Sequence, residues 1–169
     1  LTEIGSREGS IIVFLKTKHR TNLLSQYLKS YGVSVGKVHG GCTQGQRNRA
    51  IRDFKVGKTR VLCATDVAAR GLDVPQVEHV INFDLPMQDE DYVHRVGRTA
   101  RNGASGEALS FVTPQETGVW NRIAKKYQIE EALFPESKKK TSRKKKKKSS
   151  FGSSKRKPKN TKRKSRSRG

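Results

Sequence analysis

The segment 92–103 places three arginines, Arg95, Arg98 and Arg101, at intervals of three residues. On a helix, residues three apart lie on one face, so this spacing predicts that the three guanidinium groups converge on one target. A planar cation that keeps its charge throughout the physiological pH range suits the oxygens of a polyphosphate. Two glycines interrupt the run, whereas a solvated basic helix face favours Ala, Glu or Lys. We therefore expect phosphate binding here.

A second group of reactive side chains follows the apolar run 61–64. It offers a hydroxyl at Thr65, carboxylates at Asp66 and Asp73, and a glycine, Gly71, at which the backbone can approach a ligand closely. The segment is therefore a candidate ligand site. A helix-capping turn is the alternative interpretation.

A third group contains Gly40 and Gly41, followed by Gln44 and Arg47 at the expected N-terminus of a helix. Successive backbone N–H groups beside a guanidinium form a concave site for anions. Phosphate binding and simple helix capping both remain open for this segment.

No other segment offers a metal site or a nucleotide cradle. The four histidines show no paired metal spacing, and His94, beside Arg95, is the one that we expect to be functional. Segment 32–38 faintly resembles a phosphate-binding loop, but it is one residue short and lacks the hydroxyl that binds magnesium. The arginines thus suit a γ-phosphate whose nucleotide another domain must hold.

The elements that must position these residues alternate between strand and helix. Strands are expected at 11–15, 33–38, 60–64, 77–83 and 106–112. Helices are expected at 21–31, from the capping box at Thr43 to Gly57, from Asp89 through Arg98, and from the cap at Thr113 onward, with a loop or short helix at 66–73.

The helix at 21–31 is predicted from apolar residues that recur at intervals of three and four: Leu23, Leu24, Tyr27, Leu28 and Tyr31. Together the elements predict an open, mostly parallel α/β sheet with helices on both faces and right-handed crossovers. In such a sheet, ligands bind beyond the carboxyl ends of the strands. All three candidate groups are expected at that edge.

Charge divides the chain into two regions. The net charge is +22, but residues 137–169 hold 18 of the 37 lysines and arginines and none of the 15 acids, so residues 1–136 carry a net charge of only +4. The region 137–169 has one aromatic and no aliphatic residue, so it is predicted to be disordered. We expect a folded domain at 1–136 and a tail that binds phosphodiester backbones. A targeting or solubilising role is the alternative for the tail.

The two cysteines, Cys42 and Cys63, are too few for a disulfide framework, which favours a reducing compartment. No apolar run approaches the roughly 18 residues of a membrane span, and no signal peptide is evident. Bacterial cytoplasm is the expected location, with the nucleolus as the alternative. Because the chain begins at Leu1, we expect it to be part of a longer protein.

The three groups together resemble the second RecA-like domain of DEAD-box ATP-dependent RNA helicases, in superfamily 2. The resemblance covers about residues 10–127. Segment 11–14 is similar to motif IV, 44–47 to the Q-x-x-R element, 64–73 to motif V and 94–101 to motif VI. Ala100 departs from the pattern, since motif VI commonly has glycine there. The P-loop and the Asp-Glu-Ala-Asp and Ser-Ala-Thr motifs are absent from this sequence.

The resemblance implies a RecA-like fold and a role for each group. Arg98 and Arg101 would be arginine fingers that reach ATP on a partner domain, where Asp73 would bond the ribose and Gly71 would approach the phosphates. Residues that link motifs V and VI or contact the partner domain would be His94, Arg95, Arg70 and Asp66. Residues that touch or position the RNA backbone would be Gly40, Gly41, Gln44, Arg47 and Thr65.

By the same resemblance, ATP and Mg²⁺ would be held mainly by an N-terminal RecA-like domain that this sequence lacks, and the fragment alone would be inactive. The expected partners are RNA and that N-terminal domain, with no membrane. Two other functions are considered. One is a superfamily 2 DNA helicase or translocase domain, and the other is a non-catalytic RNA-binding module that acts through the basic tail.

Overall fold

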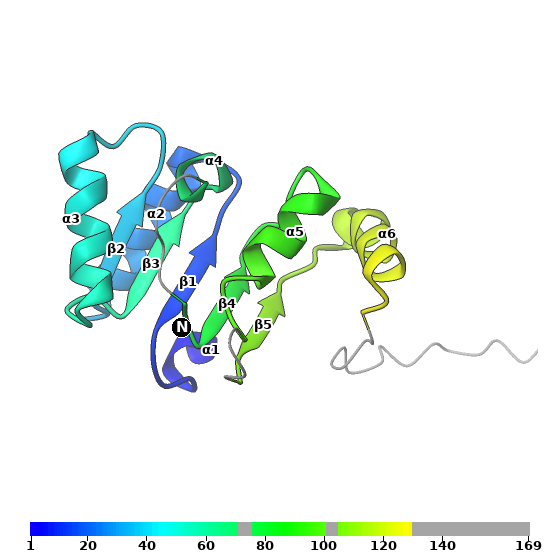
Figure 1. Cartoon of the computed structure of the whole chain (residues 1–169), viewed down its shortest axis with the longest axis horizontal. Helices are drawn as coiled ribbons and strands as arrows, with labels where there is room; N and C mark the ends of the chain where they lie inside the picture. The colour runs from blue at the N-terminus through cyan, green and yellow to red at the C-terminus, as the bar shows by residue number, and fades with distance from the viewer. Residues whose placement is uncertain (71–75, 101–104, 130–169) are drawn as a thin grey trace, which may run out of the picture. The chain divides into compact units, whose positions relative to one another are not determined.

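A single parallel sheet organises the domain. The computed structural model describes residues 1–70, 76–100 and 105–129. All strand pairs are parallel, and the order across the sheet is β2-β3-β1-β4-β5 (Figure 1). The strands are β1 (Ile11–Phe14), β2 (Val35–Val38), β3 (Val61–Ala64), β4 (His79–Asn82) and β5 (Glu107–Ser110). Each lies within its predicted range and is shorter at one or both ends.

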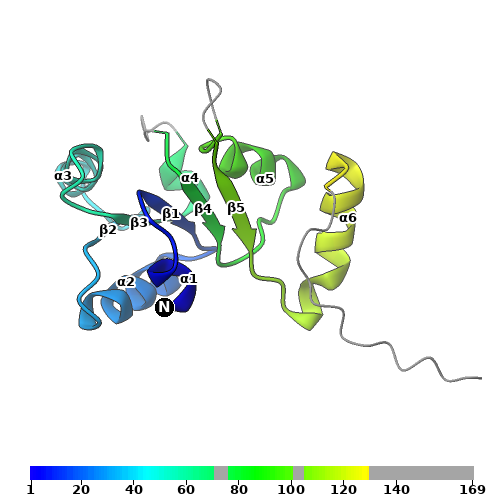
Figure 2. The same ribbon diagram turned by 90° about the horizontal axis from the view of Figure 1, so that it is seen from below.

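Helices cover both faces of the sheet (Figure 2). They are α1 (Thr2–Gly5), α2 (Lys18–Ser30), α3 (Gln44–Lys55), α4 (Asp66–Ala69), α5 (Asp89–Val96) and α6 (Thr117–Tyr127), with a 3-10 turn at Pro114–Glu116. In Figure 2, α1 and α2 lie on one face, and α3, α4 and α5 lie on the other. The predicted α/β fold is confirmed. The predicted tail at 137–169 lies outside the described residues.

The alternation of side chains along the central strands produces two separate cores. On one face, Ile12, Phe14, Leu62 and Val80 pack with residues of α3 and α4. On the other face, the alternate strand residues pack with α1 and α2; they include Ile11, Val13, Val61, Cys63 and Ile81. Strands β1 and β3 are therefore buried on both faces, which explains their continuous apolar sequences.

Capping residues set where the helices begin. Thr43 and Gln46 form the predicted capping box at α3, because the Thr43 hydroxyl accepts from the Gln46 N–H while the Gln46 side chain accepts from the Thr43 N–H. Thr113 and Glu116 form a second capping box, but it opens the 3-10 turn and α6 begins only at Thr117. The predicted cap at Thr113 is therefore confirmed, but the first turn after it is 3-10 and the α-helix begins one turn later than predicted.

Helix α2 is confirmed, but only part of its apolar stripe is buried, because Leu24 and Leu28 pack against the core and the rest of the stripe does not. The helix begins at Lys18, earlier than predicted. The side chains that it buries are Thr21, Ser25 and Leu28, whereas Leu23 and Tyr27 are about half exposed. Small side chains at 21 and 25 let the helix lie close to the sheet, and this leaves the bulky residues outside.

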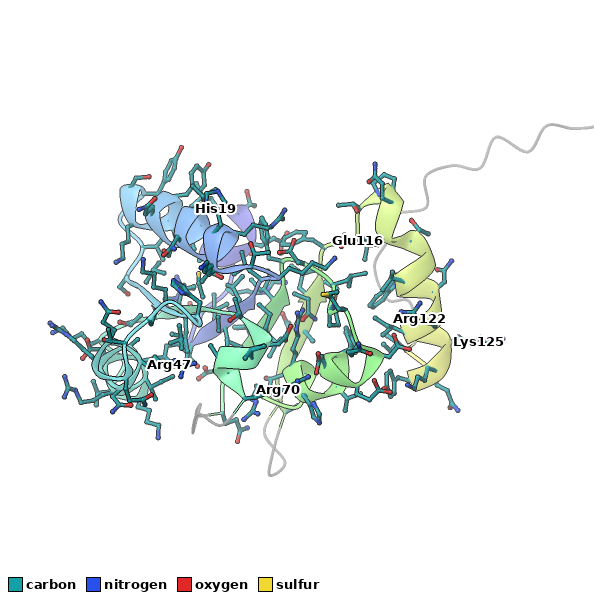
Figure 3. All side chains as sticks on the ribbon, turned by 90° about the horizontal axis from the view of Figure 1, so that it is seen from above. His19, Arg47, Arg70, Glu116, Arg122 and Lys125 are labelled. Carbon is teal, nitrogen blue, oxygen red and sulfur yellow. The ribbon has the colours of Figure 1, made fainter. Side chains whose placement is uncertain are left out.

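A third apolar cluster joins α5 to α6. Its buried members are Leu85, Tyr92, Trp120 and Ile123. The rings of Tyr92 and Trp120 meet edge to face, with centroids 5.8 Å apart. Arg122 of α6, labelled in Figure 3, also forms a bidentate ion pair with Asp89 at the start of α5. Helix α6 therefore fixes the N-terminal end of α5.

Within the described residues, none of the helices has the length and apolarity that a membrane crossing requires.

Candidate functional site

The segments that follow β2, β3 and β4 meet at one edge of the sheet. The last residues of neighbouring strands are paired, as shown by Val38 with Ala64 and Phe14 with Asn82. Because the strands are parallel, His39, Thr65 and the residues after Asn82 all leave the sheet at the same end. This is the edge at which open α/β sheets bind ligands.

Arg95 is the most extensively bonded side chain at this edge. It lies on α5 and is only 1% exposed. Its Nε and Nη2 atoms donate to the two carboxylate oxygens of Asp66 at 2.6 and 2.7 Å, and its Nη1 donates to Asn82 Oδ1 at 3.1 Å and to the Asp84 carbonyl at 2.6 Å. The guanidinium also lies 5.1 Å from the centre of the Phe14 ring.

These contacts make Arg95 a link between α5, the start of α4 and the ends of two strands. A buried guanidinium is tolerated only when its charge is paired and its N–H groups are bonded, and the bidentate Asp66 pair and the two further acceptors provide both. Arg95 is thus unavailable to a phosphate. It holds Asp66 and α5 in fixed positions.

The prediction that three arginines share one helix face is wrong. Helix α5 ends at Val96, with Gly97 as its C-cap, so Arg98 lies beyond the helix. The backbone after the helix is tied to the start of β4: Val77 N–H donates to the Arg98 carbonyl at 3.0 Å, and the Thr99 hydroxyl donates to the Val77 carbonyl at 2.6 Å. Arg101 lies outside the described residues, as do Gly71 and Asp73.

A small cavity of about 20 Å³ brings together five of the predicted residues, which are Asp66, Arg70, His94, Arg95 and Arg98. Phe14, Ala69 and Asp91 complete its lining. This volume is enough for about one water molecule. The site therefore joins the two segments that resemble motifs V and VI, and Arg98 lies half-buried at it.

Asp91 is a member of this cavity that the sequence did not single out. It lies in the first turn of α5. From the sequence, the only reason for an acidic residue at this position is its favourable interaction with the helix dipole. In the structure it is buried and forms an ion pair with Arg70, which Figure 3 shows at the end of α4. His94 Nδ1 lies 3.8 Å from Asp91 Oδ1. A long-range ion pair of this kind leaves no local signal in a sequence.

A second part of the edge is held by neutral hydrogen bonds around His39. The Gly41 N–H donates to His39 Nδ1 at 3.1 Å, and His39 Nε2 lies 3.1 Å from Asn22 Oδ1. Because Nδ1 accepts, Nε2 must carry the proton and donate to Asn22. A side chain at 41 would bring its Cβ to 3.2 Å from the imidazole, so the turn needs glycine there.

The surroundings of His39 favour the neutral ring. Burial is the main cause of a lowered pKa for His39, and the positive charges of Lys37, Lys18 and Arg47 lower this pKa further. Asn22, on α2, also accepts from Lys37 Nζ. Sequence reasoning missed Asn22 and the role of His39 because the two side chains lie on different elements.

The remaining candidates for RNA contact lie near this turn. Gln44 is exposed in the first turn of α3 and donates to Asn48 Oδ1 at 2.8 Å. Arg47 is half-buried on the side of α3 that faces α4 (Figure 3). Thr65 caps α4 through its carbonyl, which accepts from Ala69 N–H, and its side chain makes no capping bond. Thr65 is only 8% exposed, so a ligand could reach little of it.

The family now follows from comparison with known proteins. The helicase conserved C-terminal domain family matches residues 1–103. The chain belongs to this family. Its curated relatives include the DEAD-box ATP-dependent RNA helicase CshA of Bacillus cereus, 50% identical over 123 residues, which are 73% of this chain and 23% of that protein. ATP-dependent RNA helicase p62 of Drosophila melanogaster is 48% identical over 105 residues, which are 62% of this chain and 15% of that protein.

The fold of this helicase domain also matches solved structures. The C-terminal domain of the DEAD-box protein Dbp5 is 39% identical with a TM-score of 0.72, covering 76% of this chain and 77% of that one. A Dbp5 variant from S. cerevisiae bound to RNA and ADP BeF3 is 41% identical with a TM-score of 0.64, covering 69% and 32%. The resemblance to the second RecA-like domain of DEAD-box proteins is therefore confirmed. The chain spans about a quarter or less of the two curated relatives named above.

Proposed function

We propose that this domain is the C-terminal half of an ATP-dependent RNA helicase, which closes with an N-terminal RecA-like domain over ATP and single-stranded RNA. The observation that carries the proposal is the cavity between α4 and α5, where Arg95 fixes Asp66 and leaves Arg98 as a separate, half-buried cation. The names of the relatives as ATP-dependent RNA helicases support the same assignment.

In this proposal Arg98 and Arg95 have different roles. Arg98 supplies positive charge to the γ-phosphoryl group, where negative charge develops during transfer, and Arg101 is its proposed companion. An arginine in this role is worth about 10³–10⁵ in rate, or roughly 4–7 kcal/mol. Arg95 is a positioning residue, because it is only 1% exposed and its guanidinium is bonded to Asp66, Asn82 and the Asp84 carbonyl. His94 is exposed on α5 and is the proposed contact to the N-terminal domain.

The residues present fit only part of an ATP site. The described residues offer a guanidinium for a phosphate, and among them no cluster of His, Cys, Asp and Glu is placed to hold a metal ion. Gly71 and Asp73 remain the proposed contacts to the phosphates and the ribose. When bound, ATP would supply the reacting phosphate chain and Mg²⁺ would neutralise part of its charge. We assign most of the ligands of both to the N-terminal domain. The isolated chain is therefore expected to hydrolyse no ATP.

The RNA surface in this proposal is the same edge of the sheet, from the Gly40–Gly41 turn across the first turn of α3 to Thr65. The exposed turn at Gly40 and Gly41 and the side chains of Gln44 and Arg47 suit the sugar-phosphate backbone. The Gly41 N–H itself is used within the turn, where it donates to His39 Nδ1. Contacts of this kind position RNA without reading its bases. Discrimination from DNA would then depend on 2′-hydroxyls and backbone shape.

Replacing Arg98 in the intact protein tests the catalytic assignment. Arg98→Ala is expected to lower RNA-stimulated ATP turnover by about 10³-fold or more while RNA binding stays nearly unchanged. The measurements are steady-state turnover and RNA affinity, with DNA in parallel to separate an RNA helicase from a DNA translocase. Arg52→Ala, which removes a 70% exposed guanidinium from the last turn of α3, is the matched control. Unchanged turnover in Arg98→Ala would remove this residue from the mechanism.

For the tail, we propose an electrostatic tether to RNA. Removing residues 137–169 is expected to flatten the dependence of RNA affinity on salt, because each lost phosphate contact reduces the slope by about 0.7 on single strands. Binding titrations of the intact and shortened protein over a range of salt concentrations measure this slope. An identical slope would leave targeting or solubility as the role of the tail.

A further inference from the structure

A large cavity in the part of the chain that the structure describes lies away from the candidate site. It measures about 650 Å³ and is formed by α2 and the residue after β4, with Arg20, Leu23, Leu24, Tyr27 and Phe83 among its lining residues. Helix α2 covers the face of the sheet opposite α4 and α5 (Figure 2). We call this cavity the α2 groove. Nothing in the helicase function proposed above uses it.

Helix α2 leaves part of its apolar stripe exposed at this groove, although Leu28 is buried and Leu24 packs against the core. The helix buries two hydroxyl side chains, Thr21 at 0% and Ser25 at 2% exposure, against the sheet. It leaves Leu23 52% and Tyr27 50% exposed. A helix that belongs only to its own domain turns its bulky apolar residues toward the core. A contiguous apolar surface on the outside is instead typical of a docking site.

Aromatic residues extend the apolar surface at both ends of the groove. Tyr31 stacks at a tilt on Tyr27, with ring centroids 4.9 Å apart, and is 59% exposed. On the other side, Phe111 meets Phe83 edge to face at 5.9 Å and is 40% exposed. The surface is therefore a row of rings and a leucine, and such residues are enriched in protein interfaces.

The charge of the groove indicates what kind of segment covers it. Arg20 is the charged residue in its lining; its guanidinium lies 5.5 Å from the centre of the Phe83 ring, and its side chain is 49% exposed. One ion pair joins Arg20 to Asp84, whose carboxylate is nearly buried. Helix α2 carries basic residues and no acidic one. Arg20 therefore pairs with Asp84 through one nitrogen and is still half exposed at the groove, on a helix with a net positive charge.

We propose that the α2 groove docks a short amphipathic segment of a partner protein, in which bulky apolar side chains fill the groove and an adjacent carboxylate pairs with Arg20. The segment would lie along α2 with its apolar residues on one side, as in other helix-in-groove complexes. The groove offers few side chains for contact, so the buried interface is small. The complex is therefore weak and transient. The proposal is independent of the helicase assignment.

The test uses two fluorescent synthetic peptides. One is an amphipathic helix with leucine and phenylalanine on one face and glutamate on the other, and its twin has lysine in place of glutamate. Fluorescence anisotropy with the full chain is expected to show at least about tenfold tighter binding of the acidic peptide, since each decade needs about 1.4 kcal/mol. In an NMR titration, the largest amide shifts are expected around Leu23, Tyr27 and Phe83.

The basic tail also attracts acidic peptides, so the decisive comparison is between variants that keep the tail. The double variant Leu23→Ser and Tyr27→Ser is expected to weaken binding of the acidic peptide about tenfold. Val56→Ser, which changes a 70% exposed apolar residue at the C-cap of α3, is expected to leave binding unchanged. All of these side chains are exposed, so the variants should keep the thermal midpoint of the parent chain.

Equal binding by the groove variant and the Val56 variant would overturn the proposal, because the tail alone would then explain the affinity. Equal affinity for both peptides would also overturn it, since Arg20 would not select charge. Concentration-dependent dimerisation of the chain that is lost in the groove variant would identify a second copy as the occupant and would likewise overturn it. Sedimentation velocity measures this association.

Discussion

Two regions of the candidate site lie at the same edge of the sheet but are held by different forces. Between α4 and α5, ion pairs join Arg95 to Asp66 and Arg70 to Asp91. At the turn after β2, neutral hydrogen bonds join His39 to the Gly41 N–H and to Asn22. The charged region binds two segments rigidly to each other, while the neutral region sets the shape of one exposed turn.

This difference shows how each region should respond to change. A buried ion pair is costly to break from one side, because the remaining charge stays without a partner. A neutral imidazole that both accepts and donates is sensitive to proton uptake, because the protonated ring can no longer accept from the Gly41 N–H. Charge removal therefore tests the first region, and pH tests the second.

The largest effect is expected from breaking the charged region at Arg95. Arg95→Met is expected to lower the free energy of unfolding by about 3–5 kcal/mol, since it leaves Asp66 and Asn82 without their partner. Arg70→Met removes a half-exposed guanidinium but leaves the buried Asp91 carboxylate without its ion pair, so it is expected to cost less than Arg95→Met, about 1–3 kcal/mol. Urea denaturation of both variants gives the comparison. Similar losses would mean that burial does not distinguish the two arginines.

The next effect concerns pH and His39. Its pKa is lowered in the folded chain, so between about pH 6.5 and this lower value the unfolded chain binds the proton more readily. The stability that His39 contributes is therefore fully present above about pH 6.5 and is lost as the pH falls through the lowered pKa.

His39→Gln isolates this contribution, because glutamine does not titrate. Urea denaturation at a series of pH values is expected to show a shallower loss of stability on acidification in this variant than in the parent chain. Carboxylates and the other three histidines are common to both proteins, so their titration cancels in the difference. Parallel curves for the two proteins would show that the neutral form of His39 contributes no stability to the folded chain.

The smallest effect is expected at Ala100, which follows the charged region. Its φ is +53°, in the left-handed region that glycine adopts without strain. Ala100→Gly is expected to raise the free energy of unfolding by roughly 0.5–1 kcal/mol, because the relief of strain exceeds the added freedom of the unfolded chain. Differential scanning calorimetry should show a higher thermal midpoint.

Gln128→Gly is the matched control for this change. Gln128 has a φ of +51° at the end of α6, so it should give a similar gain of stability. Only Ala100 lies within the segment that resembles motif VI. A change in turnover of the intact protein that appears in the first variant alone would connect this backbone conformation to the site. A fall in stability in either variant would contradict the strain argument.

Much of the fold could be predicted because its determinants are local. Continuous apolar runs predicted the strands, and a hydroxyl followed three residues later by Gln predicted the start of α3. The motif-like segments also predicted which residues gather at the carboxyl edge. The failures concern helix ends and faces: α5 stops at Val96, before Arg98, and α2 buries Thr21 and Ser25 instead of Leu23 and Tyr27.

The sequence by itself determined the order of the elements, the separation of a basic tail from a nearly neutral domain, and the residue types available for chemistry. Only the tertiary structure decided which arginine is buried and which remains available. Arg95 and Asp66 are 29 residues apart, and they meet because α4 and α5 pack on the same face of the sheet. The spacing of residues fixes the directions of side chains within one element. The burial of a side chain depends instead on which residues of the other elements pack against it.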